Sequence, residues 1–96
     1  MDMMLCYSAA EKEWDAELNK YYKLLMGILS QESQGKLLAA QRLWLKFRDS
    51  ENTFSTDMYY GLGGTMWRIV ATQRSMDIVK TRALELKEYY ENLTRY

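Results

Sequence analysis

Two pairs of carboxylates near the N-terminus have the spacing that comes closest to catalytic chemistry. Glu11 with Asp15, and Glu13 with Glu17, are four residues apart, so each pair lies on one face of a helix. Neighbouring carboxylates can divide the roles of general acid and general base between them. The same pairs are also typical of a solvated helix face, and we favour that interpretation.

The rest of the sequence does not support catalysis. It contains no histidine and a single cysteine, Cys6, so there is no Cys-His pair and no intrachain disulfide. No glycine-rich phosphate loop follows a strand pattern, and no group of residues has metal-ligand spacing. We therefore expect a protein that is not an enzyme and that needs neither a cofactor nor a metal.

Composition limits the partners that this chain can have. Its 96 residues carry no net charge, which gives no reason to expect nucleic acid as a partner. No apolar run approaches the roughly 18 residues of a membrane span, and the opening Met-Asp-Met-Met lacks the features of a signal peptide. Before residue 20, Lys12 is the only basic residue beside five acids, namely Asp2, Glu11, Glu13, Asp15 and Glu17. These acids suit either the dipole of a first helix or a basic partner.

Apolar residues recur every three or four positions and predict three long helices, over about 3–29, 31–59 and 65–94, with a glycine loop at about 60–64. Ser30 and Thr65 are the expected N-caps. The pattern predicts an all-α, single-domain, up-down-up antiparallel bundle, with completion of the bundle by a second chain left open. The expected core stripe of the second helix consists of Leu37, Ala40, Trp44, Phe47, Glu51, Phe54 and Met58.

The segment from Gln41 to Asp49 places an amide, an indole and a guanidinium on one helical stripe, at Gln41, Trp44 and Arg48. Aligning the helices from their turns predicts two buried polar layers. One layer holds Asn19, Gln41 and Arg82, and the other holds Asp15 and Arg48 with Thr72 or Gln73 nearby. A bidentate pair of Asp15 with Arg48 is expected in the second layer. We interpret both layers as fixing helix register rather than performing chemistry.

Several of these residues also resemble the LprI-like family, which comprises small helical bacterial proteins named for a lysozyme inhibitor. The resemblance covers nearly the whole chain and rests on four segments in order: Asp15-Ala-Glu-Leu-Asn19 with Tyr22, Gln41…Trp44…Arg48-Asp49, Gly63-Gly64-Thr65, and Thr81-Arg82 with Glu85-Leu86. It implies an all-helical domain, exported to the periplasm or the cell surface, without catalytic residues. The family's recurring polar residues correspond here to Asp15, Asn19, Gln41, Arg48, Asp49 and Arg82.

The chain departs from the family in its cysteines. Many members have one cysteine where Asn52 stands here and another at about residues 72–74, and Cys6 resembles a further family cysteine that has lost its partner. The family's disulfide pattern is therefore not reproduced, which weakens the indication of an oxidising compartment.

A binding function must use the surface. The resemblance implies a lysozyme inhibitor, for which the expected contacts are Glu11, Glu13 and Glu17 on an acidic face and Tyr59, Tyr60, Leu62 and Trp67 around the glycine loop. The alternative is a helical interaction or self-association module of the bacterial envelope without inhibitory activity. The chain is expected to be a monomer or a homodimer.

Overall fold

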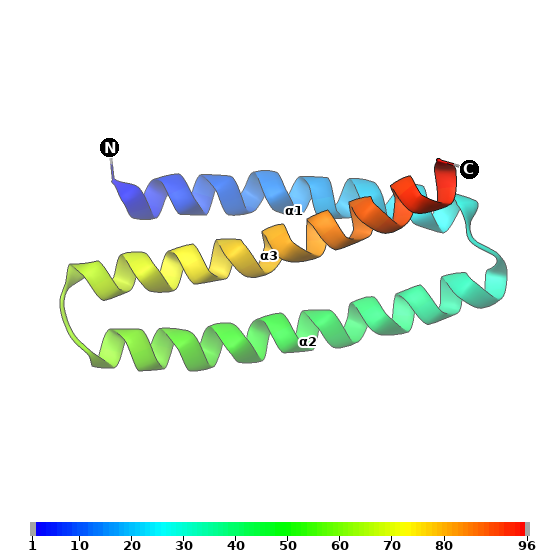
Figure 1. Cartoon of the computed structure of the whole chain (residues 1–96). Coiled ribbons are helices and arrows are strands. Elements are labelled where there is room, and N and C mark those ends of the chain that lie inside the picture. The colour runs from blue at the N-terminus through cyan, green and yellow to red at the C-terminus, as the bar shows by residue number, and fades with distance from the viewer. Residues whose placement is uncertain (1, 96) are drawn as a thin grey trace.

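Two short turns divide the chain into three helices, as the sequence predicts (Figure 1). The computed structural model describes residues 2–95 and contains α1 (Met3–Ile28), α2 (Gln31–Gly61) and α3 (Thr65–Thr94). The helices run up, down and up, so α1 and α3 are parallel to each other and antiparallel to α2. The expected all-α, three-helix class is confirmed, and α2 continues to Gly61 rather than ending near residue 59.

The turn between α1 and α2 is fixed by two side chains. Ser30 is the N-cap of α2, as expected, and its hydroxyl oxygen accepts a 3.2 Å hydrogen bond from the backbone N–H of Ser33. Gln34 reaches back across the turn, and its Nε2 donates a 2.7 Å hydrogen bond to the carbonyl oxygen of Met26. The first turn of α2 is thereby tied to the last turn of α1.

The turn between α2 and α3 depends on glycine. Gly63 and Gly64 have φ values of 77° and 89°, a region that residues with a Cβ rarely adopt. Gly64 is the N-cap of α3, and Thr65 is already helical, so the expectation that Thr65 would cap this helix is wrong. The chain enters α3 through a left-handed backbone conformation, which places the cap position one residue earlier.

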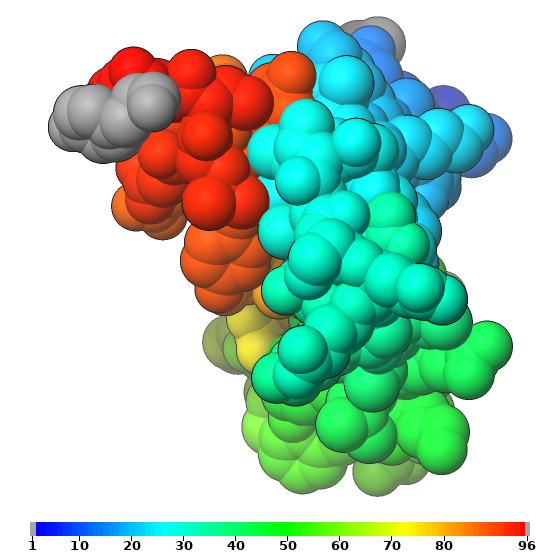
Figure 2. Space-filling view, turned by 90° about the vertical axis from the view of Figure 1, so that its right-hand side faces the viewer, coloured from blue at the N-terminus to red at the C-terminus, as the bar shows by residue number. Residues whose placement is uncertain are grey.

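The three helices form an open rather than a closed bundle. α3 packs closely along α1 and less extensively along α2, whereas α1 and α2 scarcely touch each other. Figure 1 shows α3 running between the other two helices, and the Cα trace measures 49 × 26 × 16 Å. In the end-on view of Figure 2, α2 (green) projects away from α1 (blue) and the end of α3 (red).

The hydrophobic core lies mainly between α1 and α3. Its buried residues are Leu18, Leu25, Val79, Ala83 and Leu86. Leu25 and Leu86 are the most deeply buried large side chains, with 2% and 0% of their surface exposed. Half-buried aromatic residues pack around this core, and the rings of Tyr21 and Tyr90 meet with centroids 6.0 Å apart. The core therefore stabilises the pairing of α1 with α3 more than that of α2 with either.

The expected core stripe of α2 is wrong in its C-terminal part. Leu37 and Trp44 do pack against the core, but Phe47, Phe54 and Met58 are 50%, 59% and 40% exposed. The buried residues of α2 are instead polar, namely Gln41 and Ser55. At 100° per residue, Phe47 lies about 120° around the helix from Gln41, so it cannot face α3 when Gln41 does. The spacing correctly identifies an apolar side of α2, but α3 covers a different side.

Candidate functional site: a polar groove between α1 and α2

Because α1 and α2 both pack on α3 and scarcely touch, a groove opens between them. Its central part is a cavity of about 480 Å³ with walls from α1 and α2 and a floor from α3. The α1 wall consists of Glu11, Lys12 and Asp15; the α2 wall consists of Arg48, Asp49 and Asn52; Ser75 and Val79 form the floor.

The groove continues in both directions along the helices. Toward the α1–α2 turn it passes Asp15 into a more apolar cavity of about 300 Å³, lined also by Tyr22 and Leu38. Toward the α2–α3 turn it passes Glu11 into a cavity of about 260 Å³ that ends at Tyr60. The centre of the groove is thus charged, one end is apolar, and an aromatic side chain marks the other end.

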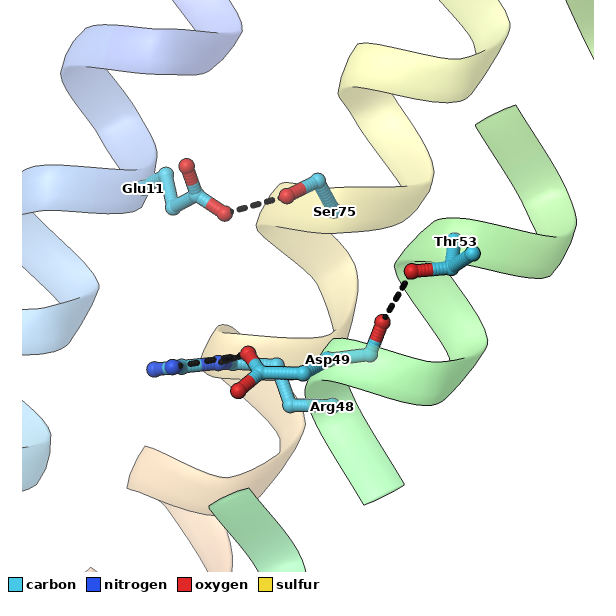
Figure 3. Close-up of polar contacts among 5 residues, drawn as sticks. All are labelled: Glu11, Arg48, Asp49, Thr53 and Ser75. Atoms are coloured by element: carbon cyan, nitrogen blue, oxygen red, sulfur yellow. Dashed lines mark hydrogen bonds and ion pairs between the residues drawn. The ribbon is translucent and has the colours of Figure 1, made fainter. Parts of the chain in front are cut away.

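Hydrogen bonds in the centre of the groove join neighbours and cross between helices (Figure 3). Arg48 donates from Nε and Nη2 to the same carboxylate oxygen of Asp49, at 3.0 and 2.9 Å. The hydroxyl of Ser75 on α3 donates to Glu11 on α1. The positive charge of Arg48 is therefore balanced within α2, while Glu11 is held against the floor of the groove.

The expected bidentate pair of Asp15 with Arg48 is not formed. Both residues line the central cavity, but Arg48 pairs with Asp49, and Asp15 accepts a 3.4 Å hydrogen bond from Asn19 Nδ2. Asp15, Asn19 and Asp49 are exposed to solvent, and Arg48 is half-buried. The Asp15 carboxylate thus faces the groove without a cation among residues 2–95 within ion-pair distance.

The other expected layer is formed in part. Arg82 Nε donates a 3.0 Å hydrogen bond to Gln41 Oε1, and both side chains are buried. Asn19 lines the same cavity as Gln41 but bonds to Asp15 on its own helix. The expected neighbour Thr72 donates its hydroxyl proton to the carbonyl oxygen of Arg68, and Ser75 rather than Thr72 or Gln73 lines the central cavity.

The three expected acidic contacts of α1 lie on two sides of that helix. Glu11 is half-buried and faces the groove, whereas Glu13 and Glu17 are exposed beside Trp14 on the opposite flank. All three lie in the N-terminal two-thirds of α1, the helix that borders the groove. A partner would therefore reach Glu13 and Glu17 from outside and Glu11 only from within the groove.

The expected contacts near the glycine loop lie at the end of the molecule that also contains the N-terminus of α1 (Figure 1). The rings of Tyr59 and Trp67 stack with centroids 5.7 Å apart and planes 8° from parallel. Tyr60 and Leu62 remain 42% and 59% exposed, and the guanidinium of Arg68 lies 5.1 Å from the centroid of the Tyr60 ring. Tyr59 and Trp67 thus stabilise the turn, while Tyr60 and Leu62 are accessible to a partner.

Two residues of the groove were not expected from the sequence. Ser75 lies seven residues, or two helical turns, before Arg82 and therefore shares its side of α3. This spacing could have identified Ser75 from the sequence. Asn52 contributes a buried Oδ1 that accepts no hydrogen bond within the described part of the chain. A buried acceptor in this state is commonly satisfied by an ordered water.

The groove offers carboxylates at its centre and apolar or aromatic side chains at its ends. Among residues 2–95, no group of three or more metal-ligating side chains comes together, and none of the three helices is both long and apolar enough to cross a membrane. Carboxylates on the two walls can accept hydrogen bonds from basic or amide groups. The apolar and aromatic ends can pack against a partner's side chains.

Comparisons with known proteins relate the chain to one family and to one bacterial protein. The sequence profile of the family described as lysozyme inhibitor LprI matches residues 1–86. The chain is also 29% identical over 105 residues to an uncharacterized protein of Rhizobium meliloti (strain 1021), in an alignment that covers 96% of this chain and 74% of that protein. No solved structure matches. The profile match covers most of the chain, and the protein therefore belongs to the family described as lysozyme inhibitor LprI.

Proposed function

We propose that this protein is a non-enzymatic binding protein that acts outside the cytoplasm and inhibits lysozyme-type cell-wall hydrolases. The family match supports this function, and one structural observation supports the surface that we propose for it. Glu11 of the acidic helix and Tyr60 of the last turn of α2 line the same cavity, so one of the acidic contacts expected from the sequence lies beside one of the aromatic contacts.

Charge favours lysozyme as the partner, because lysozyme is a strongly basic enzyme. In α1, Glu13, Asp15 and Glu17 are exposed, and Lys12 is the only basic residue before Lys20. Complementary charge raises the rate of association and orients the two proteins more than it adds affinity. The acids of α1 therefore act in docking.

Apolar contacts of the α2–α3 turn supply most of the affinity for lysozyme in this proposal. Tyr60 and Leu62 protrude beside the glycines of the turn, and their exposed apolar surface is suited to burial in a cleft. Lysozyme catalyses hydrolysis with two carboxylic residues in its cleft. Occupation of that cleft by the α2–α3 turn would exclude the polysaccharide substrate.

The test is a lysis assay in which the purified protein is titrated against lysozyme at low and at moderate salt concentration. We expect inhibition at micromolar protein that weakens as salt screens the acidic face. The variant with Glu13→Gln and Glu17→Gln should inhibit less well, whereas Glu88→Gln, an exposed acid of α3 near the opposite end, should have no effect. Absence of inhibition at micromolar concentration at both salt levels would exclude this function.

A further inference from the structure

The side of α2 that faces away from the groove carries an exposed apolar stripe. Leu43, Phe47, Phe54 and Met58 have 66%, 50%, 59% and 40% of their surface exposed. At 100° per residue these four side chains lie within about 60° of each other around the helix. Asp49, which lines the groove, is about 160° from Phe47 by the same geometry. We call these four residues the α2 stripe.

The spacing of the α2 stripe reads the same in both directions along the helix. Leu43 and Phe47 are separated by four residues, as are Phe54 and Met58, and the midpoint of the pattern lies between Ser50 and Glu51. An interface between two identical chains related by a two-fold axis needs a surface that is complementary to itself. When two copies of α2 run antiparallel about this midpoint, Phe47 of each copy faces Phe54 of the other, and Leu43 faces Met58.

We propose that the α2 stripe is the interface of a homodimer, in which α2 packs antiparallel against α2 of a second copy. Charge at the edge of the stripe fits this register. Lys46 and Asp57 lie about 20° apart on the same edge of α2, and like edges meet in an antiparallel two-fold pair. Lys46 of one copy then lies about 3 Å along the axis from Asp57 of the other, and this contact occurs twice.

Both charged edge residues are available for such a contact. Lys46 and Asp57 are exposed, and neither forms an ion pair within residues 2–95. The two Glu51 side chains would approach each other near the axis, but each is held by Arg74 of its own chain, with N···O at 3.2 Å. Their mutual repulsion is therefore offset by a local cation.

The area available is sufficient for a dimer of moderate affinity. A large apolar side chain that is half exposed presents about 100 Å², so the α2 stripe presents about 400 Å² per copy. Together with Ala40, Ser50, Lys46, Asp57 and Gly61 the two copies bury about 1,200 Å² in total, the lower end for a stable specific interface. The groove between α1 and α2 stays open in this arrangement, so each dimer presents two grooves.

Sedimentation velocity across a hundredfold range of protein concentration tests the dimer. We expect a monomer–dimer equilibrium for the unaltered chain and a dissociation constant at least ~30-fold higher for Phe47→Lys. Leu5→Lys is the matched control, because Leu5 is 65% exposed on α1 and lies outside the stripe, and it should leave the equilibrium unchanged. A monomer at every concentration, or equal weakening by both variants, overturns the proposal.

Cysteine cross-linking tests the antiparallel register. In a Cys6→Ser background, Ser50→Cys lies near the two-fold axis and should form an interchain disulfide on oxidation. Leu43→Cys should not, because its two copies are about 22 Å apart along the helix axis in this register. Cross-linking at Leu43 as readily as at Ser50 indicates parallel pairing and contradicts the proposed register.

A charge exchange tests the edge contact separately. Lys46→Glu should raise the dissociation constant several-fold by placing like charges together. Adding Asp57→Lys to that variant should restore the original dissociation constant, since the two side chains then again carry opposite charges. If the double variant is as weak as the single one, Lys46 and Asp57 do not meet across the interface.

Discussion

Arg82 donates a 3.0 Å hydrogen bond to Gln41 across the α2–α3 interface, and both side chains are more than nine-tenths buried. This contact fixes the position of α2 along α3. If one helix slid along the other, both groups would lose their hydrogen bond while they remained buried away from water. It also explains how α2 is held although its large apolar residues are mostly exposed. A buried polar contact of this kind specifies register even where it adds little net stability.

Replacement of Gln41 by Ala should lower the free energy of unfolding by about 2–3 kcal/mol, because a buried guanidinium loses its acceptor. Arg82→Met should also destabilise, since it leaves the Gln41 amide without its donor. The double variant Gln41→Ala with Arg82→Met should cost less than the sum of the two single changes, with a coupling of about 1–2 kcal/mol. Urea unfolding at one low protein concentration measures all three. Additive effects would show that the hydrogen bond does not couple the two residues.

Leu86 and Phe54 should respond very differently to truncation in spite of their similar apolar character. Leu86 is 0% exposed in the core, so Leu86→Ala should cost about 2–5 kcal/mol through lost burial and a cavity. Phe54 is 59% exposed, so Phe54→Ala should change the stability of the monomer by less than about 0.5 kcal/mol. Unfolding is best measured at high dilution, where association through α2 does not contribute. A large loss for Phe54→Ala in the dilute monomer would mean that α3 covers the α2 stripe after all.

The helices could be predicted from the sequence because their signals are local. Apolar periodicity, the cap at Ser30 and the glycines before Thr65 each act within a few residues. The apolar residues of α2 that would be covered could not be predicted, because periodicity marks an apolar side without saying whether that side has a partner in the same chain. The turn register predicts a buried Gln41, but the exposure of Phe47 is decided by how α3 crosses α2, which is not encoded in the pattern of either helix alone.

The candidate site was predicted in part. Gln41 and Arg82 meet as the turn register predicts, and both side chains are buried. Asp15 and Arg48 were placed correctly at the same cavity, but Asp49 follows Arg48 directly and offers a carboxylate at almost no cost in conformational entropy. Arg48 therefore pairs with Asp49 on its own helix rather than with Asp15 on α1, and no ion pair between these residues closes the groove.

The α2–α3 turn should tolerate alanine much less well than the helices do. Gly63→Ala and Gly64→Ala should each cost about 1–2 kcal/mol, because their φ values of 77° and 89° crowd a Cβ against the backbone. Gly35→Ala is the control: Gly35 is within α2, a Cβ there would meet nothing within 4 Å, and alanine should stabilise by about 0.5–1 kcal/mol. Thermal unfolding of the three variants gives the comparison. Equal tolerance at all three positions would show that the turn relaxes to another conformation.

Charge and apolar contact should affect lysozyme binding through different rate constants. Tyr60 and Leu62 are exposed beside the turn, so Tyr60→Ala and Leu62→Ala should raise the dissociation rate by roughly tenfold by removing buried contacts. Glu13→Gln with Glu17→Gln should mainly lower the association rate, and its effect should shrink as salt is added. Tyr89→Ala is the matched control, because this tyrosine is 47% exposed near the end of α3 that lies far from the glycine turn. Surface plasmon resonance with immobilised lysozyme separates the two rates. If Tyr89→Ala weakens binding as much as Tyr60→Ala does, the α2–α3 turn does not enter the complex, since a specific contact there must distinguish two equally exposed tyrosines at opposite ends of the molecule.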